Sequence, residues 1–369
     1  MFKTDWLKLI SEMIDADDFA SIKMSEKTGE FPREFLLHLA KNYQFFDLLL
    51  SSKDQPIAFR SFLEATRIIS KECASLASIL LTQGIYVIWT IEQFATSEQK
   101  RQYLPELLSC QMIGSFAFSE QDISLKKNLP TTAAKEVDGG WCLSGHKHMV
   151  SNVAEAGLIL VFAQTIRKTG EKGTGIFFVD ATTEGISIGS PMSKSGMKSL
   201  SLSPVTFTDV FVDSSALMGD GKQEGLSYLS QILVKMRLAI SAQALGIAEG
   251  VFQKGLGLSV LKRGFGRRLI DVSVNQFKFA DMEIRLAACE AVYHDYIKTD
   301  MTDPRRGAML KLMTTETAQE ISDEVVRIIG TYSFIEDNDI ERYVNDAKVT
   351  GLYGGSTDSL KRRVAQAWL

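Results

Sequence analysis

The spacing of apolar residues constrains the fold of this chain more than any other feature, because it changes twice along the sequence. In residues 1–111 apolar side chains recur at intervals of three, four and seven, which predicts helices. Residues 112–218 instead hold short apolar runs separated by turn residues, which predicts strands. From residue 219 to 369 the helical spacing returns. The sequence therefore predicts an α+β protein with an N-terminal helical domain, a middle domain built as a small β-barrel or sheet, and a C-terminal helical bundle.

Individual strands and helices can be placed from the same patterns. Seven strands are predicted, at residues 112–118, 132–137, 141–149, 158–163, 175–179, 186–188 and 205–212. Five helices are predicted in the C-terminal region, at residues 226–261, 275–299, 304–329, 340–348 and 356–368. Asp138-Gly139-Gly140 indicates a hairpin, and residues 172–175 indicate a further turn. Thr96 or Ser97 is expected to cap a short helix, and Pro105 to open the turn that follows it.

The charge balance of the chain excludes some classes of partner. The formal net charge is −4, whereas binding of nucleic acid needs a basic surface. Three short basic runs are interpreted as ordinary solvated charge: Lys262-Arg263, Arg267-Arg268 and Lys361-Arg362-Arg363. No apolar run reaches the ~18 residues of a membrane span, and the N-terminus lacks the basic segment and apolar core of a signal peptide. We therefore expect a cytoplasmic protein that binds neither nucleic acid nor a membrane.

The cysteines and histidines do not have the spacing of metal ligands. The four cysteines are far apart, show no CxxC pattern and are expected to be reduced thiols of the core: Cys73, Cys110, Cys142 and Cys289. His146 and His148 would share one face of a strand, but no third ligand lies near them in the sequence. We therefore predict no metal site.

Eight short segments carry recognisable motifs in a fixed order and with almost no gaps. They are residues 114–120 (GSFAFSE), 143–147 (LSGHK), 149–152 (MVSN), 196–199 (GMKS), 205–212 (VTFTDVFV), 265–266 with 279–282 (FG with FADM), 346–348 (DAK) and 353–357 (YGGST). Together they resemble the motif series of the acyl-CoA dehydrogenase family. The resemblance implies a helical domain (1–111), a β domain (112–218) and a four-helix bundle (219–369). It also implies assembly as a homodimer or homotetramer, and FAD as the cofactor.

The resemblance places the flavin ring between the β domain and the bundle. Ser119 and Ser151 fall where hydroxyls donate to the O2, O4 and N5 edge of the ring, which stabilises the anionic reduced flavin. Met149 takes the place of the family's flavin-stacking tryptophan. Lys262, beside Arg263, takes the place of the phosphate-binding arginine and keeps its charge without its bidentate fork. The residues expected at the FAD are Ser119, Met149, Val150, Ser151, Lys262, Arg263, Phe265, Ser273, Arg327, Gly330, Ser356 and Asp358.

The chain departs from the family at the residue that removes a proton. Family dehydrogenases use a carboxylate to take the α-proton of an acyl thioester while a hydride passes to flavin N5. The usual glutamate falls at Gly354, and the position used by other members falls at Met236, so no catalytic residue can be named. Four acids elsewhere have no motif support for this role: Glu224, Glu249, Asp346 and Asp358. The residues that the resemblance implies near the substrate are Leu125, Arg237, Gly354 and Gly355.

Loss of the base, together with changes at the ring contact and at the turn after Glu120, favours a changed substrate. Residues 121–126 replace a glycine-rich turn that approaches the thioester in the family. The short chain and the form of residues 355–357 resemble a branch that oxidises acyl groups on acyl carrier proteins, making hydroxymalonyl or aminomalonyl extender units for polyketide and nonribosomal peptide synthesis. Alternatives are a flavin-dependent monooxygenase of the same fold, a standard acyl-CoA dehydrogenase with a relocated base, and a non-catalytic subunit. The expected partners are an acyl thioester, on CoA or a carrier protein, and an electron acceptor.

Overall fold

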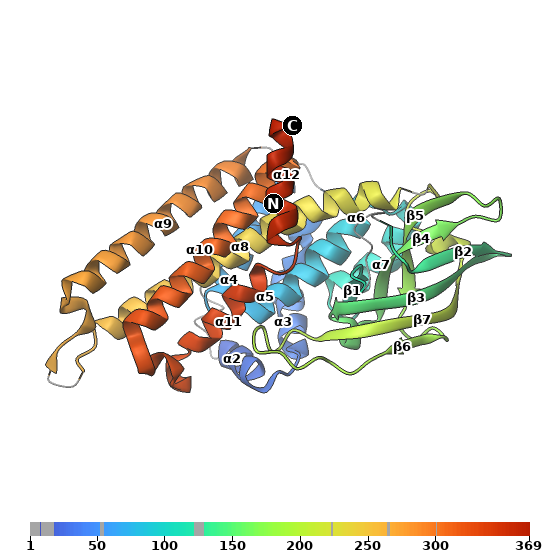
Figure 1. Cartoon of the computed structure of the whole chain (residues 1–369). Helices are drawn as coiled ribbons and strands as arrows, with labels where there is room; N and C mark the ends of the chain where they lie inside the picture. The colour runs from blue at the N-terminus through green and yellow to red at the C-terminus, as the bar shows by residue number, and fades with distance from the viewer. Residues whose placement is uncertain are drawn as a thin grey trace.

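The computed structural model describes residue 8 and residues 18–51, 55–121, 129–222, 224–263, 266–299 and 301–369. Its first part is helical, its middle part is a β-sheet, and its last part is again helical (Figure 1). The first part comprises α2 (Asp18–Thr28), α3 (Arg33–Tyr43), η1 (Phe45–Leu49), α4 (Gln55–Ser70), α5 (Ala74–Leu81), η2 (Thr82–Trp89), α6 (Thr90–Phe94) and α7 (Ser97–Leu108). This order of elements confirms the predicted fold class.

Helices α5, η2 and α6 follow one another without a break from residue 74 to 94. This stretch has 21 residues and is apolar enough to cross a membrane, so the expectation that no segment reaches that length was wrong. However, 94% of its most apolar window is buried inside the protein, as expected of a core helix. Its polar residue Gln83 is hydrogen-bonded within the core: the side-chain amide donates to Leu107 O (2.8 Å), and Gly114 N donates to Gln83 Oε1 (2.7 Å). The second helix of this kind, α8 (Gly225–Ser259), is likewise 83% buried over its apolar window.

Helix α7 begins as the sequence predicts but extends further. Thr96 accepts a hydrogen bond from Gln99 N (3.2 Å), and the Gln99 side chain accepts one from Thr96 N (3.0 Å), which forms a capping box. The helix then runs through Pro105, which was expected to open a separate turn. Pro105 lies in the last turn of the helix, where only one missing N–H has to be accommodated. The predicted break is therefore absent.

The middle of the chain forms one seven-stranded sheet with the order β1-β4-β2-β3-β7-β6, and β5 also pairs with β4. The strands are β1 (Gly114–Ala117), β2 (Ala133–Val137), β3 (Gly140–Ser151), β4 (Leu158–Ile166), β5 (Lys172–Asp180), β6 (Ile186–Ile188) and β7 (Leu202–Asp213). All seven predicted strands are confirmed. The prediction of a turn at residues 172–175 was wrong, because these residues begin β5. The chain turns just before them, where Arg167 N donates to Glu171 O (2.9 Å) and Gly170 has φ +86°.

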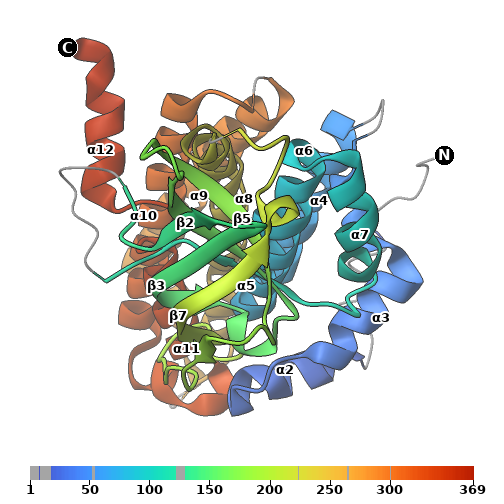
Figure 2. The same cartoon turned by 90° about the vertical axis from the view of Figure 1, so that its right-hand side faces the viewer.

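The pairing of β3 with β7 is interrupted where β3 approaches the helices. The two strands are antiparallel, and their register shifts between Lys147 and Val150. Met149 lies in this irregularity with φ +52°, and its side chain is 55% exposed. Val150, by contrast, is buried in the core of the sheet. The bulge therefore turns one strand end toward the rest of the molecule, and Figure 2 shows the helices behind the sheet.

The C-terminal helices form a bundle around α8. The other members are α9 (Ser273–Lys298), α10 (Pro304–Ile329), α11 (Ile340–Thr350) and α12 (Thr357–Ala365), which continues as the 3₁₀ helix η9 (Gln366–Trp368). All five predicted helices are confirmed, with ends shifted by about a turn or less. Arg67 of α4 connects the two helical parts, because it forms ion pairs with Glu249 of α8 and Glu290 of α9, each at 2.6 Å.

Candidate active site

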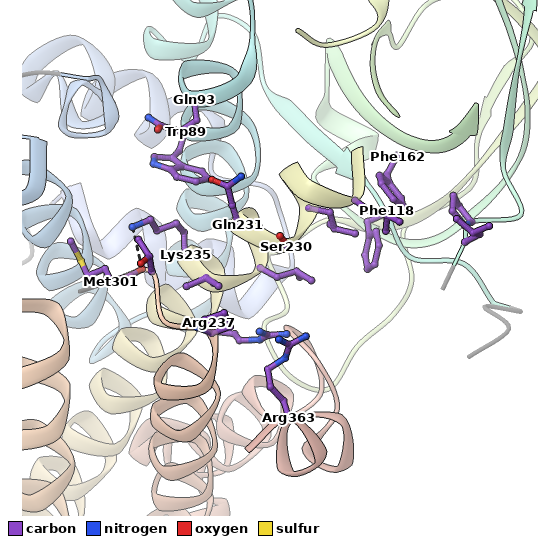
Figure 3. A pocket seen from close by; sticks show the side chains of 18 of the residues that line it. Trp89, Gln93, Phe118, Phe162, Ser230, Gln231, Lys235, Arg237, Met301 and Arg363 are labelled. Atoms are coloured by element: carbon purple, nitrogen blue, oxygen red, sulfur yellow. Dashed lines mark hydrogen bonds between the residues drawn. The ribbon is translucent and has the colours of Figure 1, made fainter. Parts of the chain in front are cut away.

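A cavity of about 590 Å³ lies where the end of β1, the first half of α8 and the chain leading into α10 meet (Figure 3). Helix α8 contributes more of the described lining than any other element, and apolar side chains predominate near the sheet. The lining residues include Trp89, Phe118, Glu120, Phe162, Leu229, Gln231, Lys235, Arg237, Met301, Thr302 and Arg363. The cavity therefore lies between sheet and bundle, which is where the sequence resemblance places the flavin ring, with the acyl thioester facing it.

The turn at residues 351–355 adjoins this cavity and is held by two buried cations. Arg237 Nε of α8 donates to Gly354 O (3.1 Å), and Lys311 Nζ of α10 donates to Gly351 O (3.0 Å) and Gly355 O (3.4 Å). Burial lowers the pKa of Lys311 to about 8 and that of Arg237 to about 10, and neighbouring cations add to both shifts. Gly354 and Gly355 have φ +75° and +107°, values that only glycine adopts readily. The turn is therefore fixed in a conformation that disfavours a side chain.

The space beside Gly354 is also filled. A Cβ built at Gly354 would lie 2.5 Å from Ile240 Cδ1 and 3.1 Å from Met236 Cε. Met236 itself is only 2% exposed. The two positions to which the resemblance assigns a base are therefore neighbours in space, and the ends of the Ile240 and Met236 side chains would have to shift to admit a side chain at position 354.

The cavity has one acid, Glu120, among the described residues that line it. Its carboxylate is fully engaged: Lys147 Nζ donates to Oε1 (2.7 Å), Thr131 N donates to Oε2 (2.6 Å) and Thr132 N donates to Oε1 (3.1 Å). Burial alone would raise the pKa of Glu120, but Lys147 and Thr131 outweigh it and lower the pKa to about 2. Such a carboxylate is a poor proton acceptor at neutral pH.

Four other acids considered from the sequence are absent from the described lining: Glu224, Glu249, Asp346 and Asp358. Glu249 is paired with Arg67 at 2.6 Å. Asp346 is fully buried, where it accepts a hydrogen bond from Met197 N (2.6 Å) and pairs with Arg342 at 3.2 Å. Asp346 thus joins two of the motif segments, residues 196–199 and 346–348. No relocated base is found among these candidates.

Tyr353, next to the turn, is tied to the core by a chain of polar contacts. Its hydroxyl donates to Gln243 Oε1 of α8. Gln243 Nε2 in turn donates to Ala74 O and Ser78 Oγ of α5, both at 2.8 Å. These hydrogen bonds hold the turn at residues 351–355 in a fixed position against α5 and α8.

Two of the predicted flavin contacts present free hydroxyls at the edge of the sheet. Within the described part of the chain, neither Ser119 Oγ nor Ser151 Oγ has a hydrogen-bond partner. Ser119 is exposed and Ser151 half-buried, and Ser119 adjoins Phe118 and Glu120 in the cavity wall. The exposed Met149 lies two residues before Ser151. Of Val150 only the backbone can contact a ligand, because its side chain is buried in the sheet.

The other predicted FAD residues divide into two groups. Ser356 caps α12 at the cavity end by accepting from Ser359 N (3.3 Å), and Asp358 follows on the same helix. The second group lies beyond the far end of α8, at the left of Figure 1, and consists of Lys262, Arg263, Ser273, Arg327 and Gly330. Phe265, and Leu125 on the substrate side, lie outside the described residues.

This second group lies far along the bundle from the cavity. Arg263 Nη1 donates to Ile329 O (3.2 Å) and its guanidinium stacks on Tyr332 at 4.0 Å, so the group is held together at the far end. From Met236 to Ser259 the helix advances 23 residues, or roughly 35 Å.

Sequence reasoning missed three cations near the site: Lys235, Lys311 and Arg363. Lys235 Nζ donates to Met301 O (3.2 Å) at the cavity wall, and Lys311 holds the glycine turn. Arg363 was read as part of a solvated basic run, yet it lines the cavity. No local motif marks these residues, because they meet the site only through packing of α8, α10 and α12.

Sequence comparison decides the family. Profiles of the acyl-CoA dehydrogenase N-terminal, middle and C-terminal domains match residues 16–111, 115–210 and 223–369. The chain belongs to the acyl-CoA dehydrogenase family. The mitochondrial short-chain specific acyl-CoA dehydrogenase of Mus musculus is 28% identical over 351 residues, which are 92% of this chain and 85% of that protein.

Solved structures of other enzymes have the same fold. Butyryl-CoA dehydrogenase from Megasphaera elsdenii superposes with a TM-score of 0.89 at 24% identity, covering 99% of this chain and 97% of that one. The prolyl acyl carrier protein oxidase AnaB superposes with a TM-score of 0.84 at 19% identity, covering 98% and 96%.

Members of the acyl-CoA dehydrogenase family are FAD-dependent oxidoreductases, and this chain is one of them. The site fits the cofactor: Ser119 lies between the lining residues Phe118 and Glu120, Ser119 and Ser151 have hydroxyls with no hydrogen-bond partner among the described residues, and Met149 is exposed nearby on β3. When bound there, FAD supplies a two-electron acceptor.

Proposed function

We propose that this protein oxidises a short acyl group, held as a thioester on an acyl carrier protein, at a carbon that already bears oxygen. The substrate would be an aldehyde hydrate or alcohol, as in the making of hydroxymalonyl or aminomalonyl extender units. The observation that carries the proposal is that the described lining of the cavity offers no available carboxylate. Gly354 and Met236 are not acids, and Glu120 is bound to Lys147 with its pKa lowered to about 2.

This chemistry needs no strong base. Removing the α-proton of an acyl thioester breaks a C–H bond and requires a positioned carboxylate. When a hydride leaves a carbon that carries a hydroxyl, the proton to be lost is on oxygen, and water can accept it. The chain's own task is then to bind the acyl group and orient it, with Arg237 fixing the glycine turn and Phe118 and Phe162 forming apolar wall.

A carrier protein is favoured over free CoA by the likeness to AnaB, although at 19% identity that likeness concerns the fold alone. The same fold accepts a carrier-bound amino acid in AnaB, so the architecture is compatible with a phosphopantetheine arm. We therefore place this chain among the carrier-protein oxidases as part of the proposal.

We further propose that the protein works as a homodimer or homotetramer. The argument is geometric: Lys262, Arg263 and Arg327 lie roughly 35 Å along the bundle from the cavity end of α8. They could serve the FAD bound mainly by another copy of the chain. Sedimentation of FAD-loaded protein tests this directly, with a monomer as the contradicting result.

The function is tested by mixing FAD-loaded enzyme anaerobically with acyl carrier protein that bears one of two groups. A 3-oxopropanoyl group, which hydrates in water, is expected to bleach the flavin and yield a malonyl group. A propionyl group is expected to leave the flavin oxidised. Bleaching by the propionyl group with formation of an enoyl product would contradict the proposal and support a dehydrogenase with a relocated base.

The same experiment also distinguishes the two remaining alternatives, a non-catalytic subunit and a flavin-dependent monooxygenase. Protein that binds no FAD would be a non-catalytic subunit. Flavin that is reduced only by NAD(P)H and a reductase, followed by oxygen-dependent product, would indicate a monooxygenase.

A variant sharpens the test by restoring a base. Met236 lies in regular helix, so Met236→Glu places a carboxylate beside Gly354 without backbone strain. We expect this variant to gain slow bleaching by the propionyl group. Met236→Gln, which matches glutamate in shape but cannot take the proton, is the control and should not gain it.

A further inference from the structure

The cavity carries more positive charge than its described acids can balance. Lys235, Arg237 and Arg363 line it, and the one described acid of the lining, Glu120, is already neutralised by Lys147 at 2.7 Å. Lys235 bonds to Met301 O. The guanidinium groups of Arg237 and Arg363 have no acidic partner among the described residues.

These two guanidinium groups lie close together at the wall of the cavity. Figure 3 shows Arg237, from α8, and Arg363, from α12, pointing toward one another. Arg237 is 6% exposed and uses Nε for Gly354 O, which leaves its two terminal nitrogens without an acceptor in the described part of the chain. The charge of Arg363, after burial, is the second cause that lowers the pKa of Arg237, so the two groups are close enough to repel each other.

We infer that Arg237 and Arg363 together bind an oxyanion of the thioester ligand. Two guanidinium forks offer parallel N–H donors that match the oxygens of a carboxylate or phosphate. An oxyanion between them would replace their mutual repulsion by attraction. The inference rests on the proposed function only in taking the ligand to be an acyl thioester.

The position of Arg237 indicates which part of the ligand this oxyanion belongs to. Arg237 is bonded to Gly354 O, and Gly354 is the residue that the resemblance places opposite the reacting carbons. A carboxylate at the end of the acyl group would therefore lie between the two arginines. The pantetheine phosphate is the other source of an oxyanion, and the experiment below separates the two.

A carboxylate site also agrees with the charge of the product of the proposed reaction. An aldehyde hydrate, R–CH(OH)₂, becomes R–COO⁻ by losing a hydride from carbon to FAD and two protons from oxygen to water. Negative charge thus develops on the oxygens during the reaction. Two cations beside those oxygens would favour loss of the first proton, which is the task that a protein base would otherwise perform.

Arg363 has a simpler explanation that must be tested against this one. It lies in the last turn of α12, where a cation stabilises the helix through its dipole. Arg362 occupies the same turn, is also exposed and does not line the cavity. Arg362→Gln is therefore the matched control for Arg363→Gln.

The test measures dissociation constants by titrating FAD-loaded enzyme with three ligands and following the flavin spectrum. Propionyl-pantetheine has no oxyanion, malonyl-pantetheine carries a carboxylate on the acyl group, and propionyl-4′-phosphopantetheine carries a phosphate. We expect malonyl-pantetheine to bind about tenfold or more tightly than propionyl-pantetheine. Arg363→Gln should abolish this advantage, Arg363→Lys should keep part of it, and Arg362→Gln should keep all of it.

An advantage of the phosphate ligand that Arg363→Gln abolishes would support the oxyanion site and assign it to the carrier arm. Equal binding of all three ligands, or equal losses in Arg362→Gln and Arg363→Gln, would overturn the inference. Because binding is measured without turnover, the proposed oxidation can fail while the oxyanion site stands, and the reverse also holds.

Discussion

Replacing Gly354 by alanine should destabilise the protein more than replacing Gly139, a glycine of similar φ with no atom near its Cβ position. The φ of +75° costs an ordinary residue roughly 1–2 kcal/mol. The added Cβ would also lie 2.5 Å from Ile240 Cδ1 and 3.1 Å from Met236 Cε, and such overpacking costs typically another 1–3 kcal/mol. We therefore expect Gly354→Ala to lower the free energy of unfolding by roughly 2–5 kcal/mol.

A matched glycine separates the two contributions. Gly139 has φ +79°, but a Cβ there would have no atom within 4 Å. Gly139→Ala should therefore cost only the conformational part, roughly 1–2 kcal/mol. The free energies can be measured by urea denaturation of FAD-loaded protein, followed by far-UV circular dichroism and flavin fluorescence, with coincident transitions as the condition for comparing them.

A double-mutant cycle isolates the crowding. Ile240→Val removes the Cδ1 atom that the new methyl group would meet and should itself cost roughly 0.5–1.5 kcal/mol. In the double variant most of the overpacking should disappear, so its loss should be smaller than the sum of the single losses by about 1 kcal/mol or more. Strict additivity, or equal losses for Gly354→Ala and Gly139→Ala, would refute the conclusion that this position has no room for a side chain.

Two further substitutions test the contacts around the cavity. Glu120→Gln leaves the buried Lys147 without its counter-charge and should lower the free energy of unfolding by roughly 3–5 kcal/mol at pH 7. Folding lowers the pKa of Glu120 from 4.5 to about 2, so its contribution to the free energy of unfolding is complete above pH 4.5 and is lost as the pH falls toward 2. Urea denaturation at several pH values should show this loss of stability in the wild type and not in Glu120→Gln. Tyr353→Phe leaves the buried Gln243 Oε1 without its donor and should cost roughly 1–3 kcal/mol by the same assay, whereas an unchanged stability would show that this hydrogen bond does not hold the turn.

The order and type of the secondary structure could be predicted because each element has a clear apolar period. The strands alternate or run apolar between turn residues, and helices such as α10 have an unambiguous start at Asp303 and Pro304. The errors arose where tertiary contacts override a local signal. Pro105 remains inside a helix, residues 172–175 belong to a strand despite two glycines, and Gln83 is accepted in a buried helix because its amide is fully hydrogen-bonded.

The site was predictable only where it is carried by contiguous motifs. The motif residues Ser119 and Lys147 could be named in advance, and the absence of an acid at Gly354 could be read from the sequence. The crowding of Gly354 could not, since it comes from Met236 and Ile240 on another helix. The position of Arg363 in the cavity wall could not be predicted either, because the sequence does not distinguish an arginine that lines a cavity from a solvated arginine at a helix end.

The central proposal is that none of the described residues at the cavity removes a proton from the α-carbon of a bound thioester. Exchange of that proton with solvent measures this capacity without any need for oxidation. FAD-loaded enzyme should be incubated anaerobically with propionyl-pantetheine in D₂O, and the α-protons followed by NMR. The account predicts exchange no faster than in buffer alone; enzyme-dependent incorporation of deuterium at the α-carbon would contradict it.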